Sequence, residues 1–213
     1  MIAFVTNYDE NTNCNYMLYS HLSISPNVEL LDASAVAFRL NQESQTERRN
    51  VFAMSHGTED ILKDQDRMAA IDSSNIANFS DMSVFSYACN TSINLGRVAS
   101  ESGCTWYGYN DRINVPEPDE ELIPMYSVLF EFIVDNFPNG NSRNSIENFI
   151  NELKGLCEIK INELDAMNVS GQFAPTSGAY QSVHQLWGKL QVWLANDSQY
   201  IMHAEADPPI FRW

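Results

Sequence analysis

Two stretches of this sequence have the same construction: VFAMSHG at residues 51–57 and SVFSYACNTS at residues 83–92. Each is a short apolar run, rich in Val and Phe or Tyr, that ends abruptly in small and polar residues. Continuous apolar runs of this length are typical of strands that are buried on both faces, as in a parallel sheet. We therefore expect two buried strands whose carboxyl ends lead into polar loops.

The flanking sequence repeats the pattern. Apolar runs at residues 2–6, 28–31 and 105–109 predict three further strands, and residues 95–102 predict a short helix that ends at Gly103. Short strands that alternate with helical stretches favour a mainly parallel sheet covered on both faces. The predicted fold class is α/β, a three-layer α/β/α sandwich around that sheet.

Beyond residue 118 the apolar residues recur at helical spacing and predict amphipathic helices. Asn144, followed three residues later by Glu147, predicts a capping box at the start of the second of these helices. Residues 165–179, rich in Ser, Gly, Pro and Asn, predict a mobile surface loop before a third helix. The apolar positions that define the three helices are Ile123, Tyr126, Phe130, Ile133 and Phe137; Ile146, Phe149, Ile150, Leu153 and Leu156; and Val183, Leu186, Trp187, Leu190 and Leu194.

The length of 213 residues suits one domain, 1–213, with a sheet-rich core at 1–114 and a mainly helical remainder at 115–213. Its 12 basic and 28 acidic residues leave a formal charge of −16. This charge should repel phosphate backbones and anionic lipids, so we expect no direct nucleic-acid partner and no membrane association. The acidity could attract basic peptides, or it could serve solubility alone.

The amino-terminal residues lack the basic region of a secretory signal, and no apolar run is long enough to span a bilayer. The four cysteines are widely spaced and include no CxxC pair, which favours free thiols and a cytoplasmic location. We find no metal-ligand spacing and no phosphate-binding glycine motif, and therefore predict no metal and no cofactor.

In a parallel sheet, working residues gather at the carboxyl ends of the strands. Here one strand leads into His56 and Gly57, and another leads into Cys89. An imidazole can take the proton of a thiol and so activate it as a nucleophile, and a following helix N-terminus can help. Main-chain amides of Gly57 and Cys89 could form an oxyanion hole. Taken singly, Cys89 could be a small core residue and His-Gly a common turn.

The conjunction resembles the caspase-like (clan CD) cysteine peptidases and, among them, the bacterial CHAT-type domains. The matching segments are FAMSHG at 52–57, SVFSYACNTS at 83–92 and WYGYNDRI at 106–113. In that family a strand ends in His-Gly, the next ends in the Cys, and a further strand with Gly-Tyr or Gly-Phe closes the core. The likeness covers residues 28–114 by sequence and the rest by architecture.

The resemblance implies a caspase-like sandwich in which His56 is the catalytic base, Cys89 the nucleophile and Gly57 an oxyanion-hole contributor. The chain departs from the family in its short segment between His56 and Cys89. It also lacks the Gln-Ala-Cys-x-Gly of animal caspases, and Tyr87 and Ala88 stand where metacaspases carry other residues. Caspase specificity for Asp therefore does not transfer, and a third catalytic residue is not evident.

Related enzymes draw a charged pocket residue from the loop after the first strand. Asp9 or Glu10 would there suit an Arg or Lys side chain of the substrate. The alternative for both residues is a solvated loop acid or a helix N-cap.

The leading hypothesis is a cysteine endopeptidase that acts on protein or peptide substrates. The resemblance also implies a regulated effector in a bacterial defence or signalling module, controlled by an upstream protease or sensor protein. Candidate processing points are residues 165–179 and the loops bearing Arg112 or Arg143. Two alternatives stay open: a catalytically silent caspase-like binding module, and a flavodoxin-like binding domain.

Overall fold

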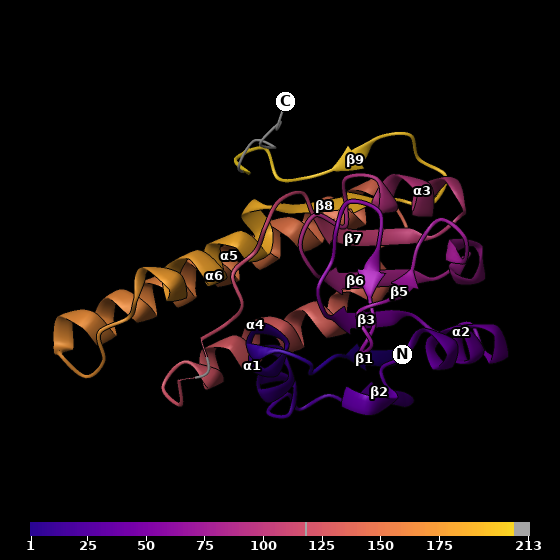
Figure 1. Ribbon diagram of the computed structural model, residues 1–213. Coiled ribbons are helices and arrows are strands. Elements are labelled where there is room, and N and C mark those ends of the chain that lie inside the picture. Colours follow the sequence, from indigo (N-terminus) through magenta and orange to yellow (C-terminus); the bar gives the residue numbers. More distant parts are fainter. Residues whose placement is uncertain (118, 207–213) are drawn as a thin grey trace.

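The computed structural model describes residues 1–117 and 119–206, which form an α/β fold around a seven-stranded sheet. The strands lie in the order β2-β1-β3-β6-β7-β8-β9, and β4 and β5 form a separate two-stranded hairpin (Figure 1). The strands are β1 (Ile2–Val5), β2 (Val28–Leu31), β3 (Val51–Met54), β4 (Leu62–Lys63), β5 (Ala69–Ile71), β6 (Ser83–Tyr87), β7 (Thr105–Tyr109), β8 (Leu190–Trp193) and β9 (Tyr200–Ile201). The helices are α1 (Glu10–Tyr19), α2 (Ala37–Thr46), α3 (Leu95–Glu101), α4 (Ile123–Asn136), α5 (Arg143–Ser170) and α6 (Ser177–Gly188), with short 3₁₀ turns at Asp32–Ser34, Ile76–Phe79 and Phe137–Asn139.

The first five strands of the sheet, from β2 to β7, pair in parallel, whereas β8 and β9 are antiparallel. The mainly parallel sheet predicted from the sequence is thus confirmed. After β1 the chain places β2 on one side of that strand and β3 on the other. Such a reversal opens a crevice at the carboxyl ends of the strands, where ligands of open α/β sheets bind.

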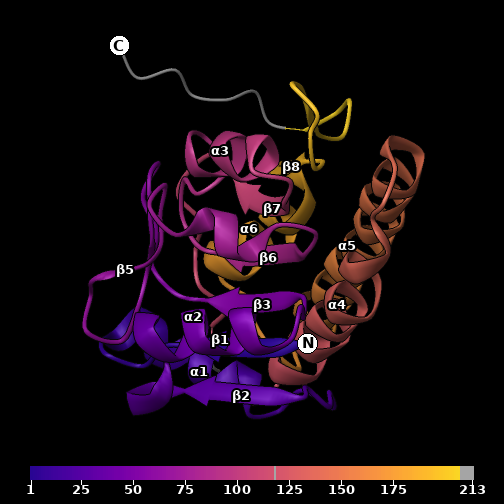
Figure 2. The same ribbon diagram turned by 90° about the vertical axis from the view of Figure 1, so that its right-hand side faces the viewer.

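Two apolar clusters pack on opposite faces of the sheet, because successive side chains of each strand point to opposite faces. Phe52 and Phe85 face the cluster that α1, α4, α5 and α6 complete. Val51 and Val84 face the other cluster, built with α2, α3 and the β4–β5 hairpin. Figure 2 shows α4 and α5 on one side of the strands, and it shows α2 and α3 away from these two helices. Helices therefore cover both faces.

The five predicted strands are present. Strands β2 and β7 have the predicted bounds, β1 ends one residue before the predicted run does, and β3 and β6 occupy the apolar parts of the stretches 51–57 and 83–92. The end of the third predicted helix is wrong. Helix α6 ends at Gly188, and Leu190 begins strand β8, in which Trp193 lies beside Trp106 of β7. Leu190 fits the helical spacing of Leu186, but pairing with β7 satisfies the main chain of residues 190–193 in the sheet instead.

The surface loop predicted at residues 165–179 is also largely wrong. Helix α5 continues to Ser170 and ends at Gly171, whose φ of 71° is the left-handed conformation typical of a helix C-terminus. Leu164 is buried, and Asp165 accepts a hydrogen bond from the Tyr180 hydroxyl of α6 at 2.8 Å. Packing against α6 therefore extends the helix through a polar stretch. Helices α5 and α6 lie along each other and project beyond the sheet (Figure 1).

The start of α5 differs from the predicted capping box as well. Ser142 is the N-cap, and its side chain accepts the main-chain amide of Ser145 at 3.2 Å. Asn144 and Glu147 therefore lie inside the helix. Among the described helices, none is long and apolar enough to cross a lipid bilayer.

Candidate active site

The strand ends that lead into His56 and Cys89 lie side by side, because β3 and β6 are neighbours in the sheet. Met54 lies beside Tyr87, and the amide of Ser55 donates to the Tyr87 carbonyl at 3.2 Å. A cleft of about 830 Å³ opens at these ends. It is lined by Asn11, Thr12, Asn15, Ser55, His56, Gly57, Thr58, Glu59, Asp60, Tyr87, Cys89, Asn90, Arg112, Ile113, Asn114 and Val115. The structure therefore brings His56 and Cys89 into one cleft.

Gly57 holds the two loops together by close approach. A Cβ atom at this position would lie 2.7 Å from the Cys89 carbonyl oxygen and 2.4 Å from the Thr91 methyl carbon. Both distances are shorter than van der Waals contact, so only glycine fits here without a shift of the backbone. The glycine of the His-Gly pair thus sets how closely the His56 loop approaches the Cys89 loop.

The hydrogen-bond partner of His56 is Asp9. His56 Nε2 lies 2.8 Å from Asp9 Oδ2, and the two side chains are 32% and 34% exposed. Asp9 follows β1 and is the N-cap of α1, where its Oδ1 accepts the main-chain amide of Thr12 at 3.0 Å. One carboxylate oxygen of Asp9 therefore caps helix α1, and the other lies within hydrogen-bond distance of His56. This contact spans the point where the strand order reverses.

The environment of Asp9 favours its ionised form. Partial burial opposes ionisation, but hydrogen bonds from Thr12 and from His56 outweigh it and hold the pKa of Asp9 below its ordinary value. An ionised carboxylate can only accept hydrogen bonds, so the proton of a neutral His56 ring is placed on Nε2. Nδ1 is then the ring nitrogen that can accept a proton from a thiol.

Cys89 is half-buried, and its sulfur contacts the main chain of Ile113. The Ile113 amide lies 3.4 Å from Sγ, and the Ile113 carbonyl oxygen lies 3.8 Å from it. Within residues 1–117 and 119–206, no hydrogen bond joins Cys89 to His56. The next residue, Asn90, has a φ of 61°, a left-handed conformation that Asn tolerates better than most residues, and the chain turns sharply there.

The amides predicted for an oxyanion hole are without acceptors in the described part of the chain, because neither Gly57 nor Cys89 donates its main-chain N–H to another residue there. The predicted helix after Cys89 is present as α3. However, the amides of Asn94 and Leu95 at its start donate to the Glu59 carbonyl at 3.2 and 2.7 Å. Helix α3 therefore binds the His56 loop and does not point these amides at the thiol.

The other cysteines have environments that disfavour a thiolate. Cys104 and Cys157 are buried, and burial raises the pKa of both thiols. Burial, together with the nearby Glu10, also raises the pKa of Cys14 on α1. Cys104 and Cys157 therefore belong to the buried core. Of the four cysteines, Cys89 lies in the cleft.

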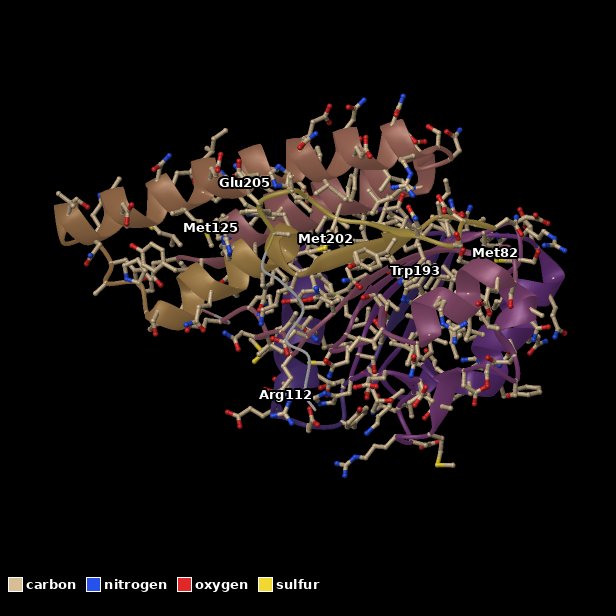
Figure 3. All side chains as sticks on the ribbon, turned by 90° about the horizontal axis from the view of Figure 1, so that it is seen from above. Met82, Arg112, Met125, Trp193, Met202 and Glu205 are labelled. Atoms are coloured by element: carbon tan, nitrogen blue, oxygen red, sulfur yellow. The ribbon has the colours of Figure 1, made fainter. Side chains whose placement is uncertain are left out.

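Charged side chains of both signs line the cleft. Glu59 and Asp60 come from the loop after His56, and Arg112 comes from the segment after β7. Figure 3 shows Arg112 apart from Met82, the residue that precedes β6. Asp9 and Glu10, the acids predicted to bind substrate, do not line the cleft. Asp9 binds His56, and Glu10 is exposed in the first turn of α1.

Three contributors to the cleft and its contacts were not predicted from the sequence. They are Asp9 as the partner of His56, Glu59, and the main chain of Ile113. The position of Asp9, directly before a helix that follows a strand, was the signal that could have placed it at the edge of the sheet with His56. Among the described residues, no group of three His, Cys, Asp or Glu side chains could hold a metal ion.

Comparison of the chain with protein-family models, with curated proteins and with solved structures found no match.

Proposed function

We propose that the cleft is the active site of a cysteine endopeptidase of the caspase-like or CHAT-like type. The observation that carries this proposal is the hydrogen bond of Asp9 to His56 in the cleft that also contains Cys89. A carboxylate that orients an imidazole in the same cleft as a thiol is an arrangement that supports acyl transfer. Asp9 supplies the third member that the sequence left open.

The reaction follows from these positions. Cys89 Sγ attacks the scissile carbonyl carbon while His56 Nδ1 takes the thiol proton, and the carbonyl π electrons move to oxygen. The amides of Gly57 and Cys89 stabilise that oxyanion. Collapse of the intermediate breaks the C–N bond, and His56 returns its proton to the leaving amine. Water, deprotonated by the same nitrogen, then hydrolyses the thioester and releases Cys89.

The arrangement of strands supports the caspase-like assignment. Strand β3 leads into His56 and Gly57, its neighbour β6 leads into Cys89, and β7 with Gly108 and Tyr109 comes next. This is the pattern that the resemblance implied for residues 28–114. Adjacent strands are about 4.8 Å apart, so a substrate carbonyl can lie between the two loops, and no direct Cys89–His56 hydrogen bond is needed beforehand.

One observation favours the alternative, a catalytically silent module of the same fold. The thiol of Cys89 donates to the Ile113 carbonyl, 3.8 Å away, and not to the imidazole. If that contact persists when a peptide is bound, the thiol proton does not pass to His56. The same cleft would then bind a peptide segment without cutting it.

Hydrolysis of fluorogenic peptides with Arg, Lys, Asp or Leu before the reporter separates these functions. The wild type should hydrolyse at least one peptide, and Cys89→Ala and His56→Ala should each lower the rate at least about a thousandfold. Cys14→Ala is the matched control, because Cys14 is also half-buried but lies on α1 outside the cleft lining. It should keep the wild-type rate.

The reactivity of the thiols completes the test. Iodoacetamide labelling mapped by mass spectrometry should modify Cys89 faster than Cys14, Cys104 or Cys157, and His56→Ala should slow the labelling. No hydrolysis of any peptide, together with labelling of Cys89 that does not depend on His56, would establish the silent module.

A further inference from the structure

The main chain of residues 111–114 connects the nucleophile to the helical half of the molecule. This segment follows β7, and Ile113 in it contacts Cys89 Sγ through its amide. At the start of the segment, the carbonyl of Asp111 accepts the amide of Asn90 at 3.2 Å. The 111–114 segment thus contacts the residue after the nucleophile as well as its sulfur.

Gln185 of α6 binds both main-chain groups of Asn114, the last residue of this segment. Its Oε1 accepts the main-chain amide of Asn114 at 2.8 Å, and its Nε2 donates to the Asn114 carbonyl. The Tyr87 hydroxyl, at the end of β6, donates to the same carbonyl at 2.8 Å. Gln185 is only 3% exposed, so water cannot readily replace these bonds.

Two further residues from the same region hold the segment more peripherally. Gln181, one helical turn before Gln185, accepts the Asn114 side-chain amide at 2.8 Å. Lys189, directly after α6, lies 3.1 Å from an Asp111 carboxylate oxygen and donates to the Arg112 carbonyl at 2.7 Å. Asp111, Arg112 and Asn114 are therefore bound by side chains of residues 181–189.

We propose that Gln185 is a positioning residue for the nucleophile: it fixes Asn114 so that the preceding Ile113 amide stays at the sulfur of Cys89. The Ile113 amide, 3.4 Å from the sulfur, can donate to it in either form and binds an anionic sulfur more strongly, whereas the Ile113 carbonyl, 3.8 Å away, can accept only from the thiol. Helix α6, which packs along α5, thereby sets the reactivity of a residue in the other half of the chain. The inference rests on the proposed function for its consequence in catalysis, but not for its effect on the thiol.

The test is the rate at which iodoacetamide labels Cys89 in Gln185→Met, followed by mass spectrometry between pH 6.5 and 9.5. Met has a similar shape but cannot hold Asn114. At pH 6.5 the rate should fall about tenfold, since a hydrogen bond to a charged group is worth about this factor. At pH 9.5, where a thiol ionises without assistance, the rate should return to that of the wild type within about twofold.

Gln191→Met is the matched control. Gln191 is also a buried glutamine, and it accepts the Ser92 hydroxyl at 2.9 Å, but it lies on β8 and its side chain binds the loop after Cys89 and not the 111–114 segment. It should label at the wild-type rate at both pH values, within about twofold. An equal loss in Gln191→Met, or a loss in Gln185→Met that does not depend on pH, would overturn the proposal.

Lys189→Met decides the matter if Gln185→Met does not fold. The Lys189 side chain is 25% exposed, so its replacement should be tolerated, and the rate at pH 6.5 should fall about two- to threefold. An unchanged rate in folded Lys189→Met would then reject the proposal. Failure of the proposed function looks different: the wild type would cut no peptide, while Cys89 labelling would still depend on Gln185.

Discussion

The two halves of the chain contribute to the cleft in different ways. All the residues that line it lie between Asn11 and Val115, in loops at the carboxyl ends of parallel strands and in the first turns of α1. The half that contains α4, α5, α6 and β8 contributes no lining residue among those described. It contributes anchors instead, above all Gln185 and Lys189, which bind the 111–114 segment.

The difference reflects how each half builds its secondary structure. Parallel strands end at the same edge of the sheet, so polar residues from several loops converge there. Helices and the antiparallel strand β8 satisfy their own main chains and offer side chains to the nearest loop. The first half thus supplies the described residues that line the cleft, and the second half holds the 111–114 segment in place. Variants in matched pairs, one from each half, can test that division.

Among the variants that compare the two halves, Asp9→Asn in the first half should have the largest effect on peptide hydrolysis. Asn caps a helix about as well as Asp, so the start of α1 should be retained. The neutral amide no longer enforces the tautomer of His56, and kcat/KM for peptide hydrolysis should fall about a hundredfold. Steady-state kinetics with the best fluorogenic peptide measures this.

The counterpart in the second half is Asp165→Asn, which changes an acid that accepts a hydrogen bond from Tyr180 far from the cleft lining. It should leave kcat/KM unchanged within about twofold. If Asp9→Asn retained wild-type kinetics and thermal stability, Asp9 would be a helix cap and no more.

The division was only partly visible in the sequence. The parallel strands could be predicted because each is a continuous apolar run, and the convergence of His56 and Cys89 followed from the neighbourhood of two such runs. Strand β8 could not be predicted, because Leu190 continues the apolar spacing of α6 and only pairing with β7 distinguishes strand from helix.

The partners of the candidate catalytic residues were harder still to predict. The contact of Asp9 with His56 depends on residues 47 positions apart and on the exact reach of a capping side chain. The contact of Ile113 with Cys89 uses the main chain, which carries no signal in residue type. Gln185 lies a further 71 positions beyond the residue that it holds. Tertiary packing alone brings such pairs together.

A second pair of variants tests the comparison between the two halves by replacing one glycine in each half with alanine. Gly57→Ala places a methyl group 2.7 Å from the Cys89 carbonyl oxygen, so the Cys89 loop must move. The substitution should cost about 1–3 kcal/mol in the free energy of unfolding and lower kcat/KM about tenfold. Urea unfolding and peptide kinetics measure the two effects.

Gly155→Ala in α5 is the counterpart, because a Cβ there meets nothing within 4 Å. Alanine favours the helix by about 1 kcal/mol over glycine, so this variant should be more stable and equally active. Loss of activity in Gly155→Ala, or full activity in Gly57→Ala, would break the comparison.

A smaller effect is expected from the acids at the cleft. Glu59→Gln and Asp60→Asn should each lower kcat/KM for an Arg peptide about two- to threefold relative to a Leu peptide, and the difference should shrink at 0.5 M salt. The exposed Glu152 of α5 is the control, and Glu152→Gln should leave the ratio unchanged. An Arg-to-Leu ratio that stays constant in the cleft variants would exclude these acids from substrate selection.

The smallest expected effect is the dependence of stability on pH that Asp9 causes. Because its pKa is below the ordinary value of 3.8 in the folded chain, ionised Asp9 stabilises the fold fully above that value. This contribution is lost as pH falls through the lowered pKa. The advantage of wild type over Asp9→Asn in urea unfolding should therefore be larger at pH 5 than at pH 3. The control is Glu10→Gln, which changes the exposed neighbour of Asp9. If the stability difference between wild type and Glu10→Gln decreased by the same amount from pH 5 to pH 3, the effect would reflect overall charge and not the contact of Asp9 with His56.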